Sequence, residues 1–210
     1  MRKTLCLVLT AMLALCALCA HADGVGQTYK AFEASYAENI VFINENTGRM
    51  LLPHNLTKDY DSRARRFYRI QSGALSMEMH MDDSGERIAT CLITLTAPAG
   101  MTYGDAQYRD FATAGYHSYA LIMAMSDAAT VADRYGLVEQ VNWGIKQYGG
   151  AFDTECGDYR LTCKSENGVA TMLFENALLV PATPEPAEPA PEMDITDEDA
   201  SEEEGDSLAG

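Results

Sequence analysis

Two neighbouring segments in which apolar residues recur at every second position constrain the fold of this chain more than any other feature. They cover residues 75–81 and 89–95, and the short polar segment Asp83-Ser84-Gly85 lies between them. Alternation with a period of two places the apolar side chains on one face of a strand, and a short glycine-containing segment joins two such strands into a hairpin. The pattern therefore predicts an antiparallel sheet with one apolar face, which another layer must cover.

A second hairpin and two helices are predicted further along the chain. Residues 159–163 and 169–174 alternate in the same way on either side of a turn at residues 166–168. Between the two hairpins, apolar residues recur at helical spacing, which predicts two amphipathic helices. The residues at helical spacing are Tyr108, Phe111, Gly115, Tyr119 and Ile122 in the first helix, and those that share a face of the second are Val131, Tyr135, Val138, Val141 and Ile145.

A shorter hairpin is predicted upstream. Its strands would lie at residues 40–43 and 50–52, around a turn at Asn46-Thr47-Gly48. Taken together, the elements favour an α+β fold in which helices pack on one face of an antiparallel sheet.

The two halves of the predicted domain are alike in outline. The helix-start segments 29–32 and 108–111 share tyrosine and phenylalanine at the same spacing, and a glycine precedes an Ala-Thr pair in both later hairpins. The matches predict two tandem helix-plus-sheet repeats of about 80 residues, 27–97 and 105–177. The alternative is that such features recur independently in any α+β chain. In layout, though in no motif, the arrangement is similar to that of the secreted β-lactamase inhibitory proteins, whose joined sheet offers a concave face to a partner.

Residues 1–22 are typical of a cleaved secretory signal peptide. Two basic residues precede an apolar run over residues 5–18, and Ala20 and Ala22 supply the small side chains that a signal peptidase recognises. The apolar run of fourteen residues is shorter than the ~20 that a membrane-spanning helix needs. We therefore expect an exported, secreted protein whose mature chain begins at Asp23 without a membrane span. The signal is of a bacterial type.

The other end of the chain is typical of a disordered tail. Residues 181–210 contain five prolines, eleven Asp or Glu and no Lys or Arg. A segment with so few large apolar groups cannot offset the entropy of ordering its backbone. We expect a solubilising Pro/Ala/Glu-rich acidic tail, with an acidic docking segment as the alternative. The folded part is then residues 23–180, which is long enough for one domain with its own core.

The net charge of this folded part limits the classes of partner that we expect it to bind. Residues 23–180 hold twenty acidic and thirteen basic side chains, a net charge of −7. Nucleic acid is a polyanion and is therefore not an expected partner. We expect a protein or an envelope polymer instead.

Three cysteines lie outside the signal peptide: Cys91, Cys156 and Cys163. Their odd number and the size of the core argue against a disulfide framework. One alternative is a Cys91–Cys163 bridge between neighbouring strands, and the other is that both are buried thiols.

Two clusters are candidate ligand sites. Met77, Met79, His80 and Met81 combine soft ligands that suit copper, but alternation places the methionines on one strand face and His80 on the other, so core packing is the better interpretation. We expect no metal and no other cofactor.

The second cluster, which is basic, consists of Arg63, Arg65, Arg66 and Arg69. It suits an anionic ligand or partner. The alternatives are a solvated face, or a contact with the chain's own acidic tail.

Catalytic motifs are absent from the sequence. The cysteines and Ser118 are potential nucleophiles, and His54, His80 and His117 are potential bases, but none has a known catalytic spacing. We therefore predict no catalytic residue and favour a non-enzymatic extracellular or cell-envelope binding module. The alternative is an extracellular hydrolase with dispersed catalytic residues. A triad of His117, Asp and Cys or Ser around one pocket would favour the hydrolase.

Overall fold

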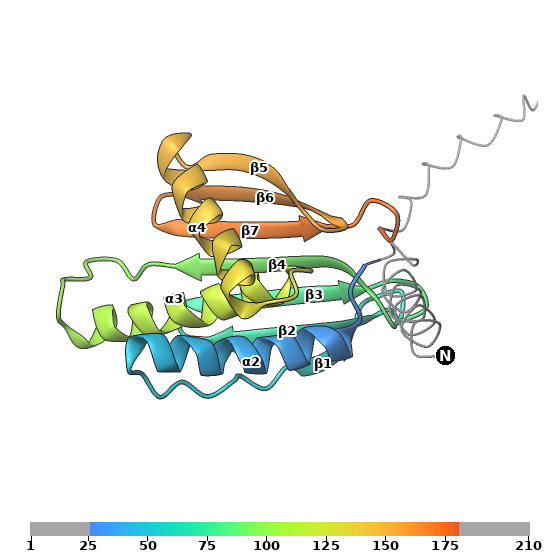
Figure 1. Cartoon of the computed structure of the whole chain (residues 1–210), viewed down its shortest axis with the longest axis horizontal. Helices are drawn as coiled ribbons and strands as arrows, with labels where there is room; N and C mark the ends of the chain where they lie inside the picture. The colour runs from blue at the N-terminus through green and yellow to red at the C-terminus, as the bar shows by residue number, and fades with distance from the viewer. Residues whose placement is uncertain (1–25, 181–210) are drawn as a thin grey trace, which may run out of the picture.

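The structure, a computed structural model, describes residues 26–180 and confirms the α+β class (Figure 1). The predicted signal peptide with its Ala22–Asp23 cleavage site and the predicted tail at residues 181–210 lie outside the described residues. The helices are α2 (Tyr29–Thr47), α3 (Ala106–Ala124) and α4 (Val131–Gln147). The strands are β1 (Thr57–Tyr60), β2 (Arg66–Ser72), β3 (Leu75–Met81), β4 (Ile88–Thr96), β5 (Ala151–Cys156), β6 (Tyr159–Glu166) and β7 (Val169–Glu175).

The seven strands form one antiparallel sheet in the order β1-β2-β3-β4-β7-β6-β5. Both predicted hairpins are confirmed, as β3–β4 and β6–β7. Figure 1 shows the three helices on the same side of this sheet. Within residues 26–180, no helix combines the length and the apolar character that a membrane crossing needs.

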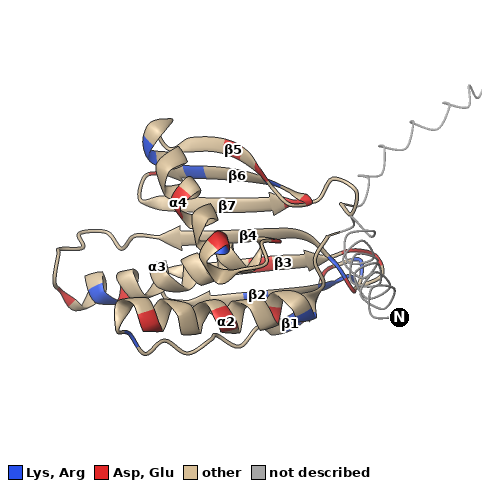
Figure 2. Ribbon diagram, in the orientation of Figure 1, with Lys and Arg blue, Asp and Glu red and all other residues tan. Residues whose placement is uncertain are grey.

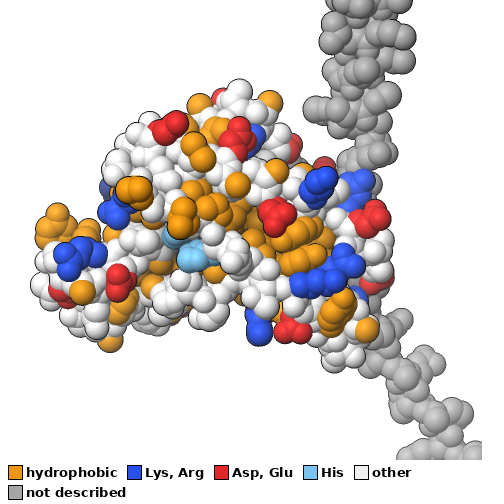
Figure 3. Space-filling view, turned by 90° about the horizontal axis from the view of Figure 1, so that it is seen from below, with side chains coloured by type: hydrophobic (Ala, Val, Ile, Leu, Met, Phe, Trp, Pro, Cys, Tyr) orange, Lys and Arg blue, Asp and Glu red, His pale blue; other side chains and the backbone are white. Residues whose placement is uncertain are grey.

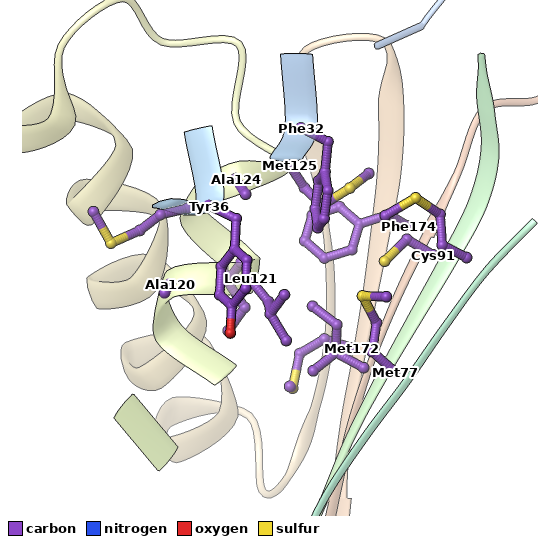
Figure 4. Close-up of a cluster of buried hydrophobic side chains, with 14 of the residues drawn as sticks. Phe32, Tyr36, Met77, Cys91, Ala120, Leu121, Ala124, Met125, Met172 and Phe174 are labelled. Atoms are coloured by element: carbon purple, nitrogen blue, oxygen red, sulfur yellow. The ribbon is translucent and has the colours of Figure 1, made fainter. Parts of the chain in front are cut away.

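The core lies between the helices and the covered face of the sheet. Side chains from α2, α3 and the central strands meet there, and Figure 4 shows them in contact across the layer boundary. Phe32, Leu121, Cys91 and Phe174 have no exposed surface. The strands other than β1 contribute every second residue to this layer, as their alternation predicts.

The predicted hairpin at residues 40–43 and 50–52 is wrong, because residues 40–43 belong to helix α2. The run of β-branched and aromatic residues from Ile40 to Ile43 resembles a strand, but the buried residues Phe32, Tyr36, Ile40 and Ile43 recur at helical spacing. The apparent turn is the end of the helix. Gly48 adopts a left-handed φ of 67° and donates its N–H to the carbonyl of Asn44, as a C-terminal helix cap does.

The two halves share an element order, although their origin by duplication stays a prediction. Each half places a helix before a three-stranded meander, and the last strands of the two meanders, β4 and β7, pair with each other. Leu92 lies opposite Leu173 at the centre of this pairing. Strand β1 occurs only in the first half, and α4 only in the second.

The strand register predicts contrasting effects for two adjacent side chains. Met79 is fully buried, whereas His80 lies on the opposite face with about a third of its side chain exposed. Met79→Ala should lower the free energy of unfolding by about 2–5 kcal/mol through lost burial and a new cavity, and His80→Ala by less than about 1 kcal/mol. Chemical denaturation of both variants measures this. Equal effects that depend on added Cu(I) would contradict the register and restore the copper interpretation.

Candidate functional site

The predicted soft-ligand cluster is divided between the two faces of the sheet. Met77, Met79 and Met81 are buried under the helices. His80 lies on the open face, where its Nε2 is hydrogen-bonded to Glu78 Oε1 and its ring stacks on Phe67 at 5.2 Å between centroids. In the part of the chain that the structure describes, no three His, Cys, Asp or Glu side chains are grouped to hold a metal ion.

The suggested Cys91–Cys163 bridge is wrong. Both thiols are free, and they belong to β4 and β6, which are separated by β7. Neighbouring strands are about 4.8 Å apart, so two cysteines with a strand between them are about 10 Å apart, beyond the ~7 Å limit of a disulfide. The alternative interpretation, buried thiols, agrees with the structure.

The arginine cluster does not converge on one point. Alternation along β2 places Arg66 and Arg69 on opposite faces, where Arg66 Nη1 donates to the carbonyl of Gly85 and Arg69 pairs with Asp59 at 3.5 Å. Arg63 and Arg65 lie in the connection between β1 and β2, and both line a cavity of about 410 Å³ at one end of the open face. The structure therefore brings together only two of the four arginines.

A buried polar cluster connects α2, α3 and the segment that follows α2. The backbone N–H of His54 donates to the Tyr36 hydroxyl at 3.3 Å, and this hydroxyl is 3.0 Å from Nδ1 of His117. The two imidazole rings are tilted, with centroids 4.1 Å apart. Figure 3, seen from the side of α2 and β1, shows histidine at the surface among hydrophobic side chains. The cluster thus extends from the core to the surface.

Burial sets the ionisation of this cluster. It lowers the pKa of His117 to about 4, with a further contribution from the neighbouring His54, and it raises the pKa of Tyr36 to about 12. At neutral pH His117 is therefore uncharged and Tyr36 keeps its proton. The Tyr36 hydroxyl accepts from the His54 backbone and forms a second hydrogen bond with Nδ1 of His117.

The residues around His117 do not form the catalytic triad that a hydrolase would need. Within residues 26–180, its ring is hydrogen-bonded to Tyr36 and to no carboxylate. Ser118 donates its hydroxyl to the carbonyl of Gly115 at 2.7 Å. Burial raises the pKa of the thiols of Cys156 and Cys163 to about 12, so neither is a ready thiolate nucleophile.

The candidate binding site is a groove between α3 and α4, which we call the aromatic groove. It has a volume of about 310 Å³, and strands β4 and β7 form its floor. Its walls are Tyr108, Phe111, Ala112, Gly115, Tyr116, Ser118, Tyr119 and Ile122 of α3, and Val141, Asn142 and Ile145 of α4; its floor is Leu95, Ala170 and Met172. None of these side chains carries a charge.

Polar groups occur at a few points of the aromatic groove. Asn142 on α4 donates to the hydroxyl of Tyr119 on α3 at 3.4 Å. The ring of Tyr116 carries the guanidinium of Arg49 at 4.4 Å from its centroid. Tyr116 and Tyr119 also line a second hollow of about 260 Å³ beside α2, so the aromatic surface continues beyond the groove.

Gly115 keeps the middle of the aromatic groove open. A Cβ atom placed on this residue would meet no other atom within 4 Å. A glycine inside a helix costs about 0.5–1 kcal/mol relative to alanine. Glycine at this position therefore lowers the stability of helix α3 and leaves space in the groove wall.

The helical spacing in the sequence identifies most of these groove residues as one side of a helix. Tyr108, Phe111 and Tyr119 lie on this side, and all three are partly buried. The buried residues of α3 are Ala114, His117, Ser118, Ala120, Leu121, Ile122, Met123 and Ala124, so Ile122 is the one large residue of the predicted set that is fully covered. The concentration of aromatic side chains on one side of α3 is the signal that distinguishes the groove face from the covered face.

Charged residues outside the aromatic groove are distributed along the chain and do not gather in one region. Figure 2 shows acidic and basic residues interspersed along the helices and strands. The uncharged lining of the aromatic groove therefore contrasts with the surface around it. Apolar lining with a few polar groups is the usual character of a ligand site.

The buried histidine predicts a pH effect on stability. Between about pH 6.5 and the folded-state pKa of about 4, the unfolded chain binds a proton that folded His117 does not, so stability falls as the pH falls, by up to about 3 kcal/mol. His117→Gln should lose this contribution. Urea denaturation of both proteins at about pH 7 and about pH 4 measures it, because the carboxylates titrate in both. An equal loss of stability in the two proteins would contradict the assignment.

No protein-family model, no curated protein and no solved structure matches this chain.

Proposed function

We propose that this protein is a non-enzymatic binding module, exported to the extracellular space or cell envelope, and that the aromatic groove holds an extended, proline-containing segment of a partner protein. The observation that carries the proposal is the uncharged aromatic lining of a groove that a helix glycine keeps open. The signal-like residues 1–22 support export.

The lining chemistry favours a polyproline II segment as the ligand. Such a segment has no internal hydrogen bonds, and its backbone carbonyls point outward. Tyrosine rings offer flat apolar faces for proline rings, while the hydroxyls of Tyr108 and Tyr116 can donate to the carbonyls. A charged ligand would lose its hydration against this uncharged lining, and the nearest cation, Arg49, already lies over the ring of Tyr116.

The size of the groove suits a short segment. A volume of about 310 Å³ is at the lower end of the range for ligand pockets. A polyproline II helix is already extended, so it loses little conformational entropy on binding. A short contact with aromatic rings is then sufficient for specific recognition.

The polar cluster around His117 supports a binding role more than a hydrolytic one. Its hydroxyl and imidazole groups satisfy each other inside the domain, and the neighbouring Ser118 is bonded to its own helix backbone. Hydrolysis needs a nucleophile within hydrogen-bonding reach of a base. No such pair lies beside the aromatic groove among the described residues.

Filling the groove tests this function. Gly115→Leu should weaken binding of a capped decaproline peptide at least tenfold, because the new side chain occupies the space that the ligand needs. The matched control is Gly136→Leu, since Gly136 is also an interior helix glycine with open space but lies outside the groove lining. Isothermal titration calorimetry measures the affinities, and a glycine-serine peptide of equal length controls for composition.

Stability separates a blocked groove from a damaged fold. Both substitutions replace a helix glycine, so each variant should be as stable as the wild type or more stable by about 0.5–1 kcal/mol. Failure of the wild type to bind decaproline would refute the ligand class. Equal affinities of the Gly115→Leu variant and the wild type would refute the site.

A further inference from the structure

The described chain ends beside the two convergent arginines. After β7, the backbone N–H of Asn176 donates to the carbonyl of Ala89 at 2.9 Å, and the N–H groups of Leu179 and Val180 both bond to the carbonyl of Asn176 at 3.0 Å. These bonds hold the end of the chain against β4. Val180 then lines the same cavity as Arg63 and Arg65.

This cavity, the arginine pocket, carries positive charge without a carboxylate in its lining. It is lined by Arg63, Arg65, His80, Met81, Ala89, Thr90 and Val180. Among the described residues, no carboxylate lies within 4 Å of the Arg63 guanidinium, and Arg65 uses its Nε for Asp61 at 2.9 Å. The terminal nitrogens of Arg65 form no hydrogen bond to a described residue. Both guanidinium groups therefore retain donors for an anion.

We propose that the arginine pocket is a carboxylate-binding site and that its occupant is the acidic segment of the same chain that begins at Glu185. Residues 181–210 carry eleven acidic side chains and no basic ones, so the charges are complementary. Glu185 is five residues beyond Val180. In an extended proline-rich conformation this separation spans at most about 16 Å, which keeps the first tail carboxylates close to the pocket.

The tether determines whether a weak contact is populated. A single exposed ion pair is too weak to fill the site. A short linker raises the effective concentration of the tail at the pocket to the millimolar range, so the site is substantially occupied when two or more charge-assisted hydrogen bonds to the guanidinium groups together give a millimolar intrinsic affinity. The contact is electrostatic, and salt should therefore release it.

Nuclear magnetic resonance of the full chain tests this contact. The tail variant carries Glu185→Gln, Glu188→Gln and Glu192→Gln, which remove charge and keep side-chain size. At about 0.01 M salt, where the Debye length is about 30 Å, the Thr90 and Arg65 amide resonances should differ between the wild type and the tail variant. At about 1 M salt, where it is about 3 Å, the two spectra should coincide in this region.

A pair of arginine variants provides the matched control. Arg63→Gln should move the Thr90 resonance toward its position in the tail variant, because either change removes the contact. Arg109→Gln should not, since Arg109 is an exposed residue on α3, outside the pocket. Because the Arg63 side chain is exposed, its substitution should not unfold the protein. Unfolding would therefore not explain a change in the Thr90 resonance.

Three results would overturn the proposal. The first is identical Thr90 resonances in the wild type and the tail variant at low salt. The second is equal effects of Arg63→Gln and Arg109→Gln. The third is a change in the pocket resonances that appears only when polyglutamate is added to the wild type, which would assign the pocket to an external polyanion.

Discussion

The pairing of β4 with β7 is the interaction on which the rest of the structure depends. These are the last strands of the two halves, and their pairing turns two small meanders into one seven-stranded sheet. The fraction of surface that a domain buries rises with its size, so the joined sheet buries more apolar surface than two separate halves would. The joined sheet places Cys91 beside Phe174 and Ile93 beside Met172, all of them buried, in the centre of the core. Both halves therefore share one core.

The same pairing aligns the open face of the sheet into rows. One row crosses the central strands through Glu78, Leu92, Leu173 and Thr162. Because side chains alternate along each strand, every row on this face has a covered row beside it. Leucines at the centre of a polar row are partly exposed, and they mark the place where the two halves meet. In the neighbouring rows of this face the same two strands pair Thr90 with Glu175 and Thr94 with Thr171, so the apolar surface at the midline is confined to the two leucines.

Local pattern predicts the elements of this fold better than their arrangement. Both hairpins and both later helices could be predicted, because alternation and helical spacing act over a few residues. The helix end at Gly48 resembles a hairpin turn, since one left-handed glycine serves both purposes. Whether Cys91 and Cys163 lie on neighbouring strands depends on the strand order, which involves segments far apart in the sequence. The aromatic face of α3 could be identified from its period, but whether it is covered depends on where α4 lies.

The position of α4 depends on a second glycine and on polar contacts with α2. A Cβ atom on Gly144 would lie 2.7 Å from the ring of Phe152, so only glycine lets α4 approach β5 this closely. From the other side, Arg134 of α4 reaches α2 and bonds to Glu38 at 2.7 Å and to Asn39 at 3.2 Å.

Asn39 in turn donates to the carbonyl of Ala120 on α3 at 3.2 Å, which connects all three helices. Directional hydrogen bonds specify helix positions more narrowly than apolar packing does, because buried polar groups are costly to leave unpaired. Helix α2 therefore contacts both α3 and α4 and fixes their positions. The aromatic groove is the space that remains between α3 and α4. Gly144 lets α4 pack closely on Phe152, whereas Gly115 adds open space to the wall of the groove.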